Sequence, residues 1–134
     1  MSRHWLFITE PDFYSYDDLE RDQGAVWGGV SNQLALKNLR DVRLGDQILI
    51  YHAGNEQAVV GMAEAVTDAY PDPAENDEMI VVVDIKPKRK FAHPVLLAEI
   101  RASDALSEFD LTRTPPPVMA VSNAQWDAIQ EMLV

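Results

Sequence analysis

The pattern of apolar and polar positions divides the chain into short strands separated by turns and short helices. Runs rich in aromatic and β-branched residues, several of them with alternating polarity, are typical of strands. These runs predict strands over His4–Thr9, Gln47–His52, Ala58–Ala69, Met79–Lys86 and Val118–Val121.

The second of these strands has the clearest alternation. Ile48, Ile50 and His52 fall on one face of it. Leu49 and Tyr51 fall on the other, because successive side chains of a strand point to opposite faces. In the strand Met79–Lys86, by contrast, the continuous apolar run Ile80–Val83 predicts burial on both faces.

Capping signals predict helices between the strands. Ser15 with Asp18, and Ser122 with Gln125, have the spacing of capping boxes. Another helix is predicted around Leu97–Arg101. Short strands mixed with short helices are typical of an α+β fold, which we expect to be a curled sheet or small barrel with helices at its ends.

The segment Val26–Asn32 is where we expect a ligand. Two glycines follow Trp27, and residues without a Cβ let the backbone pass close to another object. Ser31 and Asn32 are both good N-caps, and an apolar helical pattern follows them. An aromatic ring beside free backbone N–H groups would suit a flat, polar ligand. A buried tryptophan packed over a glycine turn accounts for the same residues.

Composition narrows the class of protein. The chain has 134 residues, 47% of them apolar and 25% charged, which is typical of one globular domain, here 1–134. It has no cysteine, no apolar run of membrane-spanning length and no signal pattern, which suits a cytoplasmic protein. The net charge of −11 argues against a domain that grips long duplex DNA through many phosphates, but not against a pocket that reads one base.

Several separated motifs, taken in order, resemble one family. The resemblance covers nearly the whole chain, and its specificity comes from the order and spacing of the motifs. They are Trp5-Leu6-Phe7, Glu10-Pro11, Tyr14-Ser15, Asp17-Asp18-Leu19, Trp27, Gly29-Val30, Asn32, Leu44-Gly45-Asp46, Tyr51-His52, Val60-Gly61 and Ala69–Pro73. Together they resemble the EVE domain, a branch of the PUA-like superfamily.

The resemblance implies a PUA-like pseudo-barrel with short flanking helices. It also implies a binding module, not an enzyme, that reads a modified base such as a modified cytosine in RNA or DNA, without a cofactor. The family's pocket residues correspond here to Thr9, Glu10, Trp27, Gly29, Val30, Ser31, Asn32, Tyr51 and His52.

The chain departs from the family pattern at several polar positions. The family's Lys-Ser is Ile8-Thr9 here, so a positive charge is missing. The Asp and Arg of the tryptophan turn are Gly28 and Ser31, and a run of three prolines, 115–117, replaces polar residues near the C-terminus. The resemblance therefore implies that fold and pocket location are kept, while the ligand differs or the pocket has lost its role.

The pocket residues have the chemistry of a base reader. Trp27 would stack on the base, and Asn32 can both donate and accept at its edge. Glu10 would accept from an exocyclic amine, or bond local backbone N–H groups. His52 would line the pocket, or be a strand-end histidine bonded to backbone.

Two other function classes stay open. The acidic chain and the altered polar positions also fit a small-metabolite or protein-interaction module. A nucleotide hydrolase would need a metal, and the sequence has no ligand set with the spacing for one. Basic residues offer phosphate contacts at Lys37, Arg40 and Arg43, while the cluster Lys86–Lys90 is either a phosphate contact or a solvated hairpin end.

Overall fold

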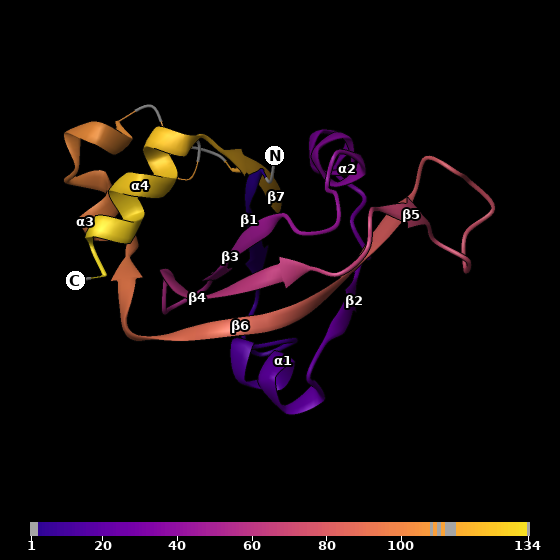
Figure 1. Ribbon diagram of the computed structural model, residues 1–134, viewed down its shortest axis with the longest axis horizontal. Helices are drawn as coiled ribbons and strands as arrows, with labels where there is room; N and C mark the ends of the chain where they lie inside the picture. Colours follow the sequence, from indigo (N-terminus) through magenta and orange to yellow (C-terminus); the bar gives the residue numbers. More distant parts are fainter. Residues whose placement is uncertain (1–2, 108, 110, 112–114, 134) are drawn as a thin grey trace.

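The computed structural model describes residues 3–107, 109, 111 and 115–133, and these form a strongly curled sheet with helices around it (Figure 1). Within this part of the chain the sheet has seven strands, in the order β2-β6-β4-β3-β1-β7, with β5 paired to β6. The strands are β1 His4–Thr9, β2 Ala25–Trp27, β3 Gln47–His52, β4 Ala58–Ala65, β5 Tyr70–Pro71, β6 Val81–Leu96 and β7 Val118–Val121.

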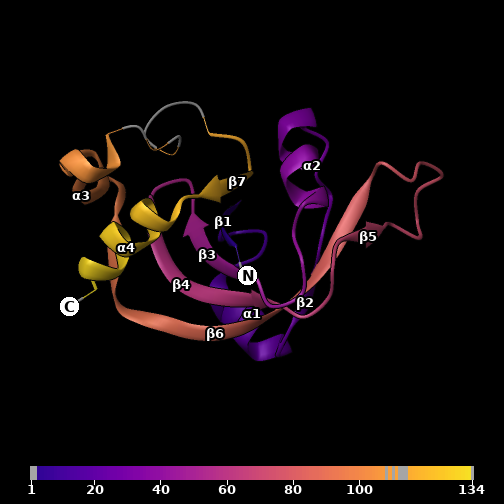
Figure 2. The ribbon, with the colours of Figure 1, turned by 45° about the horizontal axis from the view of Figure 1, so that its top comes forward.

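The helices lie at the edges and ends of this sheet. They are α1 Tyr16–Asp22, α2 Gln33–Arg40, α3 Leu97–Arg101 and α4 Asn123–Glu131, with a 3₁₀ turn over Asp104–Leu106. Helices α3 and α4 gather at one end of the molecule, away from α2 (Figures 1 and 2). This arrangement confirms the predicted α+β fold, a curled mixed sheet with short flanking helices.

Strand β1 lies between β3 and β7 in the sheet. It runs parallel to β3 and antiparallel to β7. Its end at Thr9 therefore lies beside the end of β3 at His52. The turn that follows Thr9 leads into α1, whose first residues Ser15 and Asp18 form the predicted capping box.

Apolar side chains are buried on both faces of β3, and the faces are those that the alternation predicts. Ile48 and Ile50 belong to one buried cluster. Leu49 and Tyr51 belong to a second, on the other side of the sheet.

A buried carboxylate fixes the start of β1 against the turn before β3. Asp46 accepts hydrogen bonds from the indole Nε1 of Trp5 and from the backbone N–H groups of Arg3 and Arg43, each at 2.9 Å. Three donors on one buried carboxylate satisfy it without water. The Trp5 indole is thus fully engaged in the core.

The prediction of a hairpin end at the basic cluster is wrong. Strand β6 runs without a break through Lys86–Lys90 and spans Val81–Leu96, where Met79–Lys86 was predicted. Strand β4 ends at Ala65, four residues before the predicted end at Ala69. Alternate lysines of β6 find carboxylate partners across the sheet: Lys86 and Lys88 lie 3.6 and 3.9 Å from Glu64. The density of charge made this run resemble the end of a hairpin, although its lysines recur at every second position, as they do on one face of a strand.

Candidate ligand-binding pocket

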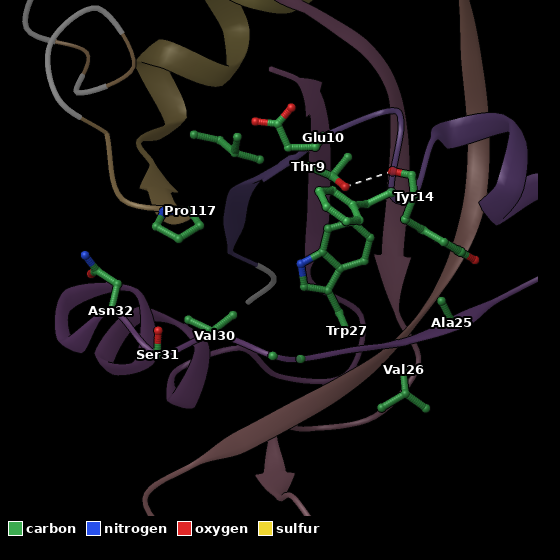
Figure 3. A pocket seen from close by; sticks show the side chains of 14 residues that line it. Thr9, Glu10, Tyr14, Ala25, Val26, Trp27, Val30, Ser31, Asn32 and Pro117 are labelled. Atoms are coloured by element: carbon green, nitrogen blue, oxygen red, sulfur yellow. Dashed lines mark hydrogen bonds between the residues drawn. The ribbon is translucent and has the colours of Figure 1, made fainter. Parts of the chain in front are cut away.

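A cavity of about 430 Å³ opens between the end of β1, strand β2 and the start of α2. Its size lies within the range of about 300–1,000 Å³ typical of ligand sites. Seven of the predicted site residues line it, and Figure 3 labels most of them: Thr9, Glu10, Trp27, Gly29, Val30, Ser31 and Asn32.

Trp27 forms one wall of this cavity. Its ring packs on the core side against Phe7, with centroids 5.5 Å apart, and edge-on against Tyr14 at 6.2 Å. The indole nitrogen faces the side where Val30 and Pro117 lie (Figure 3), and it has no hydrogen-bond partner among the described residues. The wall therefore offers both an aromatic surface and a free N–H donor.

The two glycines after Trp27 serve different purposes. A Cβ on Gly28 would lie 2.4 Å from Cγ1 of Val82 on β6, so the backbone passes against that strand. Gly29 has a φ of +70° and open space around the position of a Cβ. The sequence predicted that the backbone passes close to another object at these glycines. That object is strand β6, which Gly28 approaches, while Gly29 makes the left-handed turn.

Asn32 is the residue that caps α2. Its Oδ1 accepts from the backbone N–H of Ala35 at 2.9 Å. This engages one lone pair of the oxygen, so the amide offers its two N–H donors and keeps a second lone pair, as the donor and acceptor expected from sequence.

Glu10 and Thr9 supply the acceptors. The Glu10 carboxylate makes no hydrogen bond to any described residue, so the alternative of local backbone bonding is not observed. Thr9 Oγ1 donates to the backbone carbonyl of Tyr14 at 2.8 Å and keeps lone pairs free (Figure 3).

Two predicted residues, Tyr51 and His52, do not line this pocket. Tyr51 is buried in the second core cluster, on the other side of the sheet. His52 accepts from the backbone N–H of Tyr16 through Nε2 at 3.0 Å, which requires its proton on Nδ1, 2.7 Å from Oε1 of Glu56. Its ring thus anchors the start of α1. Of the two roles expected for His52, this is the strand-end histidine that bonds to backbone.

Sequence reasoning missed several lining residues, among them Phe13, Tyr14 and Pro117. Pro117 adjoins the pocket because its carbonyl accepts from the N–H of Ile8 at 2.9 Å. Burial and a hydrogen bond to Asp22 raise the pKa of Tyr14 to about 12, so its phenol stays neutral and its hydroxyl is engaged outside the pocket. The tri-proline run was visible in the sequence, but its pairing with β1 was not.

None of the three predicted phosphate contacts lines this pocket, although Arg40 lines a neighbouring cavity that shares Gly29, Val30 and Ser31 with it. Lys37 and Arg40 are on α2, and Arg43 is in the turn after it. Arg40 donates to the carbonyl of Met79 at 2.8 Å, and Arg43 donates to the carbonyl of Arg40 at 2.7 Å. Their contact with phosphates stays a prediction.

Charge around the pocket is one-sided. None of the described residues that line it is a lysine, arginine or histidine.

Nowhere in the part of the chain that the structure describes do three or more histidine, aspartate or glutamate side chains form a group that could hold a metal ion. In the same part of the chain, every helix is too short or too polar to cross a membrane.

Comparison with known proteins identifies relatives along the whole chain. The model of the EVE domain family matches residues 3–132. Thymocyte nuclear protein 1 from Gallus gallus is 34% identical over an alignment 87 residues long, which covers 56% of this chain and 36% of that protein. The chain therefore spans little more than a third of the length of this curated relative.

Solved structures share the fold. Rpa0253 from Rhodopseudomonas palustris superposes with a TM-score of 0.91 at 32% identity, covering 97% of this chain and 92% of that one. Human THYN1, crystallised with DNA that contains 5-methylcytosine, superposes with a TM-score of 0.89 at 24% identity and covers 98% of both chains. At that identity the human structure is evidence for the fold alone.

The two glycines give a first test of the pocket wall. Gly28→Ala should lower the free energy of unfolding by about 1–3 kcal/mol, because its Cβ collides with a β-branched side chain in a packed sheet. Gly29→Ala should cost about 1 kcal/mol, from backbone strain alone. Urea unfolding of both variants measures this, and an equal or smaller loss for Gly28→Ala would contradict the close approach to β6.

Proposed function

The chain belongs to the EVE domain family, and from that premise we propose that it is a non-catalytic binding module that holds one modified nucleobase of RNA or DNA in the Trp27 pocket. The observation that carries the proposal is the Trp27 wall, an aromatic face whose indole N–H has no partner among the described residues. A base needs such a face to stack on, and donors and acceptors at its edge.

The polar groups of the pocket favour a base over a phosphate. Trp27 and Asn32 offer N–H donors, and the Glu10 carboxylate offers an acceptor. Phosphate binding relies on cationic side chains, which the described lining lacks. A base inside the pocket with its phosphates outside suits this distribution of charge.

A modified cytosine is the first base to test. Cytosine carries an exocyclic amine, and a carboxylate is the acceptor suited to it. Human THYN1 was crystallised with DNA that contains 5-methylcytosine, so we take that base as the initial probe for this chain.

A small-metabolite module is the second candidate, favoured by one observation. Lysines of β6 are paired with carboxylates, Lys90 with Asp17 at 2.6 Å and Lys86 with Glu64 at 3.6 Å, which leaves this surface few free cations for a polyanion. Binding of a free nucleoside or other metabolite, with no binding of oligonucleotides, would favour this candidate.

Substitution of the wall residue tests the proposal. Trp27→Ala should weaken binding of 5-methyl-2′-deoxycytidine about tenfold or more, because stacking contributes about 1–3 kcal/mol per base. Trp27→Phe keeps a ring and loses the N–H donor, so its affinity for the nucleoside should fall between those of wild type and Trp27→Ala. Isothermal titration calorimetry gives the affinities, and circular dichroism shows that each variant is folded. Unchanged affinity in folded Trp27→Ala would remove the stacking role.

The carboxylate is tested by a pair of ligands. Glu10→Gln should weaken binding of 5-methyl-2′-deoxycytidine by about fivefold or more, because a hydrogen bond to a charged group is worth about 1.5–3 kcal/mol. Thymidine, which lacks the exocyclic amine, is the matched ligand and should lose nothing. An equal effect on both nucleosides, measured by the same calorimetry, would contradict recognition of the amine by Glu10.

A further inference from the structure

A phenylalanine outside the predicted site stands at the mouth of the pocket. Phe13 is 87% exposed, the most exposed of the large apolar side chains described, and it lines the cavity. Val26, which is 61% exposed, lines the same cavity. Leaving a phenyl ring in water forgoes the free energy of its burial, so this rim is an uncovered apolar surface beside the site.

The backbone that carries Phe13 is fixed before any ligand arrives. The N–H groups of Phe13 and Tyr14 both donate to the carbonyl of Glu10, at 3.0 and 2.9 Å. Thr9 Oγ1 then donates to the carbonyl of Tyr14 at 2.8 Å. A ring on a preformed turn loses little conformational freedom when a partner packs on it.

The charges of the molecule say what kind of contact this rim can make. The net charge is −11, and no cation lines the pocket among its described residues. On β6, Lys88 donates to Gln47 at 2.9 Å and Lys90 pairs with Asp17 at 2.6 Å. Because no described cation lines the pocket, a nucleic acid gains affinity inside it from its bases, and phosphate contacts would come from cations outside the lining, such as Lys37 and Arg40.

We propose that Phe13 is a second stacking platform, which receives the base next to the one held against Trp27. This rests on the proposed function of the pocket. Proteins that bind single strands stack successive bases on aromatic side chains, and such contacts tolerate any neighbouring base. The ligand is then a short single-stranded segment that carries the modified base.

Three probes separate the two platforms. The first is the nucleoside 5-methyl-2′-deoxycytidine, and the second is a DNA trinucleotide with 5-methylcytosine between two thymidines. The third is the same trinucleotide with both flanking bases replaced by abasic residues, which keeps the phosphates. Wild type, Phe13→Ala, Phe13→Leu and Leu44→Ala are compared by calorimetry. Leu44, 67% exposed and outside the pocket lining, is the matched control.

Wild type and Leu44→Ala should bind the base-flanked trinucleotide about tenfold or more tightly than the abasic one. Phe13→Ala should lose this preference and bind the nucleoside as wild type does. Phe13→Leu, which keeps apolar surface without an aromatic face, should lose most of the preference too.

Each other outcome overturns a stated part. A preference for flanking bases that survives in Phe13→Ala, or is absent in wild type that binds the nucleoside, overturns the role of Phe13 and leaves the Trp27 pocket standing. No binding of any probe by wild type overturns the proposed reading of 5-methylcytosine, and the role of Phe13 with it.

Discussion

The close passage of the chain at Gly28 against β6 is the constraint on which the pocket depends. Gly28 lies where any Cβ would meet Val82 at 2.4 Å, and the residue before it, Trp27, pairs with Val83. This contact seats the short strand β2 on the edge of the sheet. The Trp27 ring is thereby held against Phe7 and Tyr14 on one side and left open to the cavity on the other.

The polar character of the pocket follows from how its neighbours are stabilised. The helix cap engages one lone pair of the Asn32 oxygen and leaves its NH₂ group, while the turn after β1 leaves the Glu10 carboxylate without a described partner. On the outside of the sheet, β6 offsets its lysines with Glu64 and Asp17. The described donors and acceptors of the pocket thus stay available while these lysines are engaged, which under the proposed function suits recognition of a base more than of a phosphate backbone.

Local signals indicated the turn from Trp27 to Asn32, and the resemblance to the EVE domain added Thr9 and Glu10. Long-range pairing then changed which residues line the pocket. Capping chemistry and the glycine pair predicted the seat of Trp27 and Asn32, because both depend on near neighbours in the chain. The two-residue period of β3 was also predicted correctly. The position of His52 at the end of that strand did not reveal its role, because its ring accepts a hydrogen bond from the backbone N–H of Tyr16 in α1. Such a partner 36 residues away leaves no local pattern.

Phe13 was missed for a different reason. The sequence gives no sign that the turn after Glu10 would face the cavity, since that depends on where β1 lies relative to β2 across the curled sheet. Strand β6 was cut short because a run of charges resembles a loop. Whether a lysine is solvated or paired is decided by the strand beside it, here β4 with Glu64.

The central claim is that a base stacks on Trp27, and the indole N–H signals test it directly. The chain has three tryptophans, and a ¹⁵N–¹H spectrum reports each indole separately. Trp5 is bonded to Asp46, and Trp126 stacks on His4 with centroids 4.1 Å apart, so both are internal controls. Titration with 5-methyl-2′-deoxycytidine should shift the Trp27 signal and leave the other two in place. A Trp27 signal that does not move while the nucleoside binds would contradict the account.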